Sequence, residues 1–263
     1  MNLYRSAYHC LMLDDIPQKQ ACVDALYNNW QAGKLNREEF ELQRIEIPGR
    51  PDKPELIHPA KLKQRKLGSE LGRATLIHAI THIEFNAINL ALDAVYRFRD
   101  MPDDYYTDWL QVAHEESCHF SLLKQRLEDL GYHYGDFPAH NGLWEMVLKT
   151  DHDVMTRMAL VPRVLEARGL DVTPPMMQKL QKAGDIKTVE ALKIILRDEI
   201  GHVAIGSRWF KYCCEKRGLP HEEQFRLLLK EYMGVGLRGP FHTEARIKAG
   251  FSQEEIDELI KMT

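Results

Sequence analysis

The sequence ILRDEIGHVAIGSRWF, residues 195–210, places a glutamate and a histidine three positions apart inside an apolar helical pattern. The stretch VAHEESCHFSLL, residues 112–123, repeats this arrangement. The two pairs are Glu199 with His202 and Glu116 with His119. A step of three residues rises about 4.5 Å along one helix face, so a single turn can present both side chains to one ion. Each stretch therefore predicts a helix that carries two metal ligands among its core residues.

Two further helical patterns each carry one glutamate. Glu84 fills the central gap of an apolar stripe in residues 77–95, and Glu166 follows the apolar positions of residues 144–162. Four carboxylates that point into one core need cations, because an unpaired buried carboxylate is costly. One Glu from each of two helices and a Glu-x-x-His pair from each of two others form the ligand set of di-iron and di-manganese carboxylate bundles.

The spacing of the glutamates indicates an internal repeat. Glu84 and Glu116 are 32 residues apart, and Glu166 and Glu199 are 33 apart. This pattern predicts two copies of a helix pair that face each other around two metal ions. The predicted metal ligands are Glu84, Glu116, His119, Glu166, Glu199 and His202.

The remaining patterns predict an all-α fold, a ferritin-like four-helix bundle with extra N- and C-terminal helices. The expected core helices end at glycines or at a proline turn and cover residues 68–99, 103–130, 142–168 and 185–217. Additional helices are expected at 17–46, 221–232 and 252–262, with a short one after Pro174 and Pro175. The proline-rich segment 48–69 is predicted to be an extended linker, or strap, that packs over the core. The expected divisions are 1–67, an N-terminal helix and strap; 68–217, the metal bundle; and 218–263, a helical extension.

Composition narrows the class of protein. The 263 residues carry a net charge of −4 and a pI near 6.3, which gives no general attraction to nucleic acid or membranes. The five cysteines are odd in number and lack a CxxC spacing, which favours reduced thiols over a disulfide framework. The first residues do not resemble a signal peptide, and no apolar run approaches the roughly 18 residues of a membrane span. A cytoplasmic protein without membrane association is expected.

Other interpretations of the charged residues stay open at this point. Glu55 and His58 share the three-residue spacing but lie between prolines, without an apolar stripe. The buried glutamates could be neutralised by arginine or by hydrogen bonds instead of metal. Asp198 and His82 are candidates for supporting roles beside the ligands. A further group could be a solvated face or could meet an anionic substrate: Arg157, Arg163 and Arg168.

Four long stretches resemble one known family. They are GRATLIHAITHIEFNAINLALDAVYRFRDMP (72–102), HEESCHFSLLKQRLEDLGYHYGDFPAHNGLWEM (114–146), RMALVPRVLEARGLDVTPPM (157–176) and RDEIGHVAIGSRWF (197–210). The sequence is similar to a bacterial family of ferritin-like proteins of unassigned function, and more distantly to the di-iron tRNA hydroxylases. The resemblance implies a ferritin-like bundle and assigns the ligand role to the six residues named above.

Carboxylate and imidazole ligands suit iron or manganese and also bind zinc. We expect two Fe ions, or alternatively Mn or a mixed Fe/Mn pair. The expected function is an O₂-dependent oxidoreductase, a hydroxylase or oxidase, that acts on a small or nucleoside-type substrate with an electron-donor protein. The alternatives are a ferroxidase or iron-handling protein and an RNA-associated protein, with tRNA as the partner, whose metal is structural.

Overall fold

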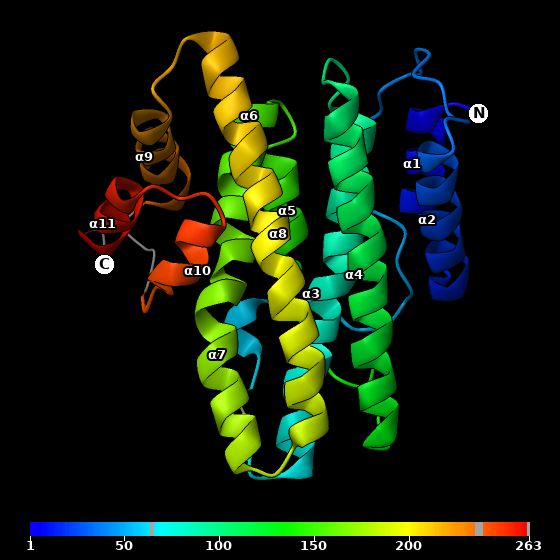
Figure 1. Cartoon of the computed structure of the whole chain (residues 1–263). Helices are drawn as coiled ribbons and strands as arrows, with labels where there is room; N and C mark the ends of the chain where they lie inside the picture. Colours follow the sequence, from blue (N-terminus) through cyan, green and yellow to red (C-terminus); the bar gives the residue numbers. More distant parts are fainter. Residues whose placement is uncertain (64–65, 235–238, 262–263) are drawn as a thin grey trace. The chain divides into compact units, whose positions relative to one another are not determined.

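The computed structural model describes residues 1–63, 66–234 and 239–261, and its ordered elements are helices (Figure 1). The predicted all-α class is confirmed, since the described residues contain only two isolated β-bridges and no strand. The chain divides into two compact units, unit 1 at Met1–Leu148 and unit 2 at Lys149–Thr263. The division expected from the helical patterns and the proline-rich segment, at residues 67 and 217, stays a prediction about which segments fold together. None of the described helices is long and apolar enough to cross a membrane.

Unit 1 is built on two long helices joined by a short turn. They are α3 (Glu70–Arg97) and α4 (Asp103–Asp129), as the sequence predicted. The Ser69 hydroxyl accepts a hydrogen bond from the Gly72 amide and begins α3, while Gly131, at a φ of 76°, ends α4. Helix α1 (Leu3–Met12) packs on α3, and α2 (Ile16–Gln31) packs on α4 (Figure 1).

The segment after α2 differs from the prediction. The helix expected over 17–46 ends at Gln31, and Gly33 follows with a φ of 64°. Among the described residues between Gly33 and Ser69, the 3₁₀ turn η1 (Pro59–Lys61) is the only helical element. Side chains of unit 1 satisfy its backbone: Arg99 donates to the Phe40 carbonyl oxygen at 2.7 Å, and Trp144 Nε1 donates to that of Glu46 at 3.0 Å. Contacts with Arg99, in the turn after α3, and with Trp144 of α5 (Gly142–Lys149) therefore help to hold this segment, and periodicity does not reveal such contacts.

The prediction of reduced cysteines is wrong for two of the five. A disulfide joins Cys10 of α1 to Cys22 of α2. Helix α1 was not predicted, so no sequence pattern placed Cys10 beside Cys22. Cys118 is a free, exposed thiol, and Cys213 and Cys214 are free and buried.

Helix α5 ends at the boundary between the units, with only Lys149 in unit 2. Unit 2 continues with α6 (Val154–Leu160), the π-helix η2 (Val161–Glu166) and α7 (Ala167–Lys182). The helix predicted at 142–168 is therefore broken, because Asp153 accepts a hydrogen bond from the Thr156 amide and starts a new helix. Beyond η2 the helix continues through Gly169, and Pro174 and Pro175 lie inside α7. The short helix expected after these prolines is thus part of α7.

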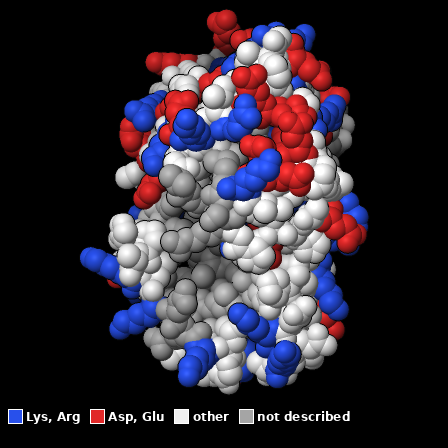
Figure 2. Space-filling view, turned by 90° about the vertical axis from the view of Figure 1, so that its left-hand side faces the viewer, with Lys and Arg blue, Asp and Glu red and all other residues white. Residues whose placement is uncertain are grey.

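Helix α8 (Ile186–Arg217) begins at its predicted cap, Asp185, and packs on α6, η2 and α7. The unit ends with α9 (His221–Met233), α10 (Thr243–Lys248) and α11 (Gln253–Lys261), of which α10 was not predicted. Two buried ion pairs hold the C-terminal helices, Arg163 with Glu255 at 2.7 Å and Arg246 with Asp171 at 2.8 Å. Acidic side chains gather in the upper part of the face shown in Figure 2, where α9 and α11 lie.

Candidate metal centre

Unit 1 brings three of the six predicted ligands together, and we call Glu84, Glu116 and His119 the first ligand set. Glu84 comes from the middle of α3, and the other two come from adjacent turns of α4. All three are buried, with 4%, 1% and 2% of their surfaces exposed. His119 Nδ1 lies 3.3 Å from Glu116 Oε2 and 3.6 Å from Glu84 Oε2. One ligand atom from each residue lies within 4.8 Å of the others, so this cluster could hold a metal ion.

The electrostatics of the first ligand set are those of carboxylates crowded in a site of low dielectric. Burial raises the pKa of Glu84 to about 8, and the nearby Glu116 carboxylate adds to the increase. Burial by itself lowers the pKa of His119, but the hydrogen bonds with Glu116 and Glu84 raise it to about 11. The cluster therefore favours additional positive charge, which either protons or a divalent cation can supply.

Aromatic side chains surround this part of unit 1. The rings of Phe85 and Phe120 lie 5.8 Å apart, and Tyr134 packs against both, with centroids 5.9 and 5.1 Å away. Trp109, which lies two helical turns before Glu116, is fully buried. Phe85 directly follows Glu84, and Phe120 directly follows His119. Each of these ligands therefore has an aromatic residue as its neighbour in sequence. Tyr134 comes from the loop after α4, and helical periodicity could not have placed it.

His82 occupies a different face of α3 from Glu84. Its Nδ1 lies 2.8 Å from the Tyr134 hydroxyl, and its Nε2 lies 3.2 Å from the His140 carbonyl oxygen and 3.0 Å from Asn86 Nδ2. Among the described residues, these contacts do not include a predicted metal ligand. A supporting role for His82 next to the ligands stays a prediction, and the observed contacts fix it to the loop after α4.

The remaining predicted ligands, which we call the second ligand set, lie in unit 2. Glu199 and His202 are one turn apart on α8, and His202 Nδ1 lies 3.4 Å from Glu199 Oε1. Glu166 is buried at the last position of η2, which packs on α8. The Glu-x-x-His geometry of α4 is thus repeated on α8, while the single glutamate sits on a π-helix instead of an α-helix.

Nearby charged residues have structural partners. Asp198, the other predicted supporting residue, forms an ion pair with Arg197 at 2.8 Å, and its role beside a ligand histidine stays a prediction. The solvated-face interpretation is wrong for Arg157 and Arg163, because both are fully buried. His58 accepts a hydrogen bond from the Ala60 amide and begins η1, which explains this residue without a metal.

Comparisons with known proteins identify the family to which the chain belongs. Residues 12–257 match the family described as "Protein of unknown function (DUF455)". An "Uncharacterized protein" of Haemophilus influenzae (strain ATCC 51907 / DSM 11121 / KW20 / Rd) is 48% identical over 251 residues, which cover 91% of this chain and 87% of that protein. No solved structure matches the chain. The chain belongs to the DUF455 family, which confirms the predicted resemblance to a family of unassigned function.

Proposed function

We propose that this protein is a non-heme di-metal carboxylate protein that holds two iron ions, or manganese in one or both positions. The ions would be bound by the first and second ligand sets together. We further propose that it is an O₂-dependent oxidoreductase, a hydroxylase or oxidase acting on a small or nucleoside-type substrate. The observation that carries the proposal is the first ligand set, in which two buried carboxylates and one imidazole converge from two helices.

The donor atoms favour this class of metal site. Oxygen and imidazole nitrogen ligands suit iron and manganese, whereas a structural zinc site is usually built from cysteine and histidine. Two iron ions, when bound, can supply the electrons that reduction of O₂ requires. The internal repeat supports a second, matching contribution, because α8 presents Glu199 and His202 with the spacing and contact that α4 gives Glu116 and His119.

The protein side chains would orient the metal ions and exclude water. Glu84 and Glu116 each place one carboxylate oxygen within 3.6 Å of His119 Nδ1, so these three residues would hold a metal ion. Phe85 and Phe120, the residues that follow Glu84 and His119, are buried apolar side chains on the same helices. An apolar surrounding lowers the local dielectric and keeps bulk solvent from a reactive centre.

Metal analysis of protein purified without chelator tests the site. We expect two iron or manganese ions per chain, at least one of which is lost in Glu116→Ala and in Glu199→Ala. Glu115→Ala is the matched control, because Glu115 lies beside Glu116 on α4 but accepts a hydrogen bond from Gln111. Magnetic coupling between the ions would support a shared site. Two uncoupled ions, or wild-type metal content in both ligand variants, would refute it.

Oxygen consumption separates the proposed activity from its alternatives. We expect the reduced, iron-loaded protein to consume O₂ with an electron donor, in proportion to an oxidised organic product. Oxidation of free Fe²⁺ without an organic product would instead indicate a ferroxidase. No consumption, with unchanged tRNA binding in Glu116→Ala, would indicate an RNA-associated protein with a structural metal. Either of these results would replace the oxidoreductase proposal.

A further inference from the structure

A cavity of about 530 Å³ lies in unit 1 between α3 and the segment that precedes it. Its volume falls within the range of roughly 300–1,000 Å³ that is usual for small-molecule sites. Aliphatic side chains from three parts of the chain form most of its lining, including Leu62, Leu67, Leu76, Ile83 and Leu143. Ile83 is 46% exposed although it is a large apolar residue on a core helix. The cavity therefore presents apolar surface that a ligand could cover.

One wall of this cavity carries polar side chains. His82, Asn86 and His140 line it, and His82 is tied to the other two through its Nε2 atom. These polar side chains interrupt the apolar lining of the cavity.

The charge around the cavity is positive. Lys63 lines it and also lines an adjoining cavity of about 320 Å³, which Lys61 borders as well. The two cavities share further residues, namely Leu62, Thr75 and Pro138. Among the described residues, no aspartate or glutamate lines either one. A ligand that fills this apolar space would meet ammonium groups without competing carboxylates.

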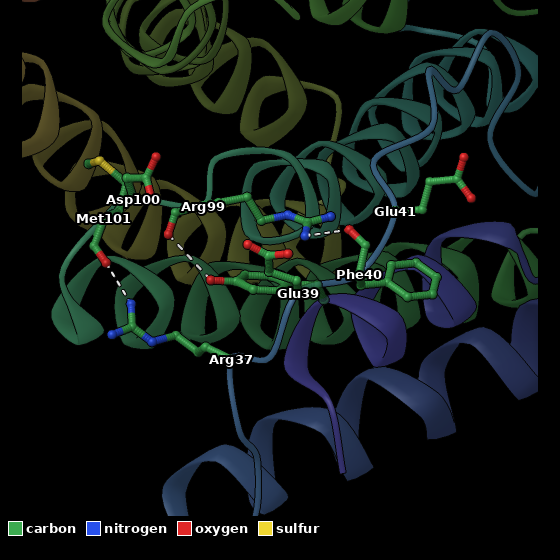
Figure 3. A pocket seen from close by; sticks show the side chains of 8 residues that line it. Arg37, Glu39, Phe40, Glu41, Arg99, Asp100 and Met101 are labelled. Atoms are coloured by element: carbon green, nitrogen blue, oxygen red, sulfur yellow. Dashed lines mark hydrogen bonds between the residues drawn. The ribbon is translucent and has the colours of Figure 1, made fainter.

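A larger cavity of unit 1, of about 830 Å³, lacks this combination (Figure 3). Its two arginines are accompanied by three acidic residues, and each guanidinium is already bound to backbone. Arg37 donates to the Met101 carbonyl oxygen and Arg99 to that of Phe40, both at 2.7 Å. These arginines stabilise the segment before α3, and the contrast favours the lysine-bordered cavity as the ligand site.

The lysine-bordered cavity is separate from the first ligand set. Ile83 and Asn86 line the cavity, whereas Glu84 lies between them in sequence and belongs to the cluster with His119. Asn86 is two residues beyond Glu84, roughly 200° around α3. Ligand binding here and metal binding at Glu84 can therefore be tested independently.

From these observations we propose that unit 1 has a binding site for an amphipathic carboxylate, a molecule with an unbranched apolar body of medium length and one anionic head group. The apolar body occupies the cavity lined by Leu76, Ile83 and Leu143. The head group lies at the end bordered by Lys63, where the two cavities adjoin. The polar wall around Asn86 limits how far the apolar body extends.

Calorimetric titration of the full chain with decanoate, decanol and decyltrimethylammonium tests the proposal. We expect decanoate to bind most tightly and the cationic amphiphile most weakly. Ala79→Trp should weaken decanoate binding by at least about tenfold, because the indole would displace two or more buried methylenes at about 0.8 kcal/mol each. Ala79 is an exposed position that lines the cavity, so this variant should fold. Ala21→Trp, at an exposed position of α2 outside the cavity, is the matched control.

The charge requirement is tested separately. Lys63→Glu should weaken decanoate binding by about threefold to fivefold and remove the preference for decanoate over decanol, consistent with an exposed charge pair. Lys34→Glu changes the net charge equally at an exposed lysine outside the cavity and should have no effect. Unchanged binding in Ala79→Trp, or no binding of any probe, would overturn the site. Equal affinity for the three head groups would overturn the ligand class. Glu116→Ala should bind decanoate normally.

Discussion

The two units contain the same order of metal-ligand residues on different backbones. In unit 1, Glu84 lies in the middle of an uninterrupted helix of 28 residues, and Glu116 and His119 follow on α4. In unit 2, Glu166 lies at the end of a six-residue π-helix, and Glu199 and His202 follow on α8. A repeated ligand pattern therefore does not require a repeated helix geometry, provided that other residues support the irregular turn.

The support in unit 2 comes from residues around η2. Pro162 lacks an amide hydrogen and interrupts regular α-helical bonding, which is consistent with the wider turn of a π-helix. Arg163, on the same turn, forms a buried ion pair with Glu255 and lies over the rings of three phenylalanines, at 4.1 to 4.8 Å from their centroids. Unit 1 buries a cation in a different way. Among the described residues, the ammonium group of Lys19 is bound by two carbonyl oxygens and an amide oxygen and contacts no carboxylate.

The largest effect should come from removing the carboxylate that supports η2. Glu255→Gln keeps the size of the side chain but leaves the Arg163 guanidinium buried without its counter-ion. Breaking one side of such a pair costs about 3–5 kcal/mol, so the free energy of unfolding should fall by that amount. Chemical denaturation followed by circular dichroism measures it. Glu258→Gln, on the same helix and in an exposed pair with Lys261, should change it by less than about 1 kcal/mol. A small effect in both variants would show that η2 does not depend on this pair.

The buried cation of unit 1 should make stability depend on pH. Lys19 Nζ donates hydrogen bonds to the Cys10 and Leu11 carbonyl oxygens and to Asn89 Oδ1, and burial lowers its pKa from 10.5 to about 7. Between these values the unfolded chain binds more protons than the folded chain, so stability rises with pH. Relative to Lys19→Met, the wild-type protein should gain about 3 kcal/mol between about pH 6.5 and about pH 9.5.

Denaturation of both proteins at several pH values measures this gain, and the difference between them removes the contribution of other titrating groups. Parallel stability curves would mean that the three oxygen partners keep Lys19 charged in the folded state. In that case both units would keep a charged group buried, Lys19 in unit 1 and Arg163 in unit 2.

A pair of glycines on α8 tests the contact between η2 and α8. A Cβ atom at Gly206 would lie 2.3 Å from Pro162 Cγ, whereas one at Gly201 would meet no atom within 4 Å. Gly206→Ala should therefore destabilise the protein by about 1–3 kcal/mol through overpacking. Gly201→Ala should stabilise it by about 0.5–1 kcal/mol, because alanine is the better helix former. Thermal unfolding of the two variants measures the difference. Equal shifts of the same sign would show that Pro162 can move away from α8.

Periodicity and capping residues were sufficient to predict α3, α4 and α8. Their stripes are long, and Gly131 and Asp185 mark boundaries with a known physical role. The ligand turns of α4 and α8 were predicted for the same reason, since a step of three residues on a helix fixes which side chains are neighbours. Whether the two ligand sets share their metal ions stays a prediction.

The parts that sequence patterns missed depend on contacts between distant segments. The chain after Gln31 is held by Arg99 and Trp144, and the Cys10–Cys22 disulfide depends on the packing of α1 beside α2. The π-helix at η2 depends on tertiary contacts of Pro162 and Arg163. Arg163 looked like a surface charge because its partner, Glu255, lies 92 residues further along the chain.

The smallest predicted difference concerns the residues that cap the N-termini of α3 and α8. Asp185 caps α8 by accepting from the Thr188 amide at 3.2 Å, and Ser69 caps α3 by accepting from the Gly72 amide at 3.1 Å. Asp185 is buried, whereas Ser69 is exposed, so water can replace only the serine hydroxyl. Asp185→Ala should cost about 1–2 kcal/mol and Ser69→Ala about 0.5–1 kcal/mol. Thermal unfolding of the two variants measures these losses. Equal losses of stability would mean that solvent access to the N-terminal cap does not differ in effect between α3 and α8. The difference between the units would then come from η2 alone.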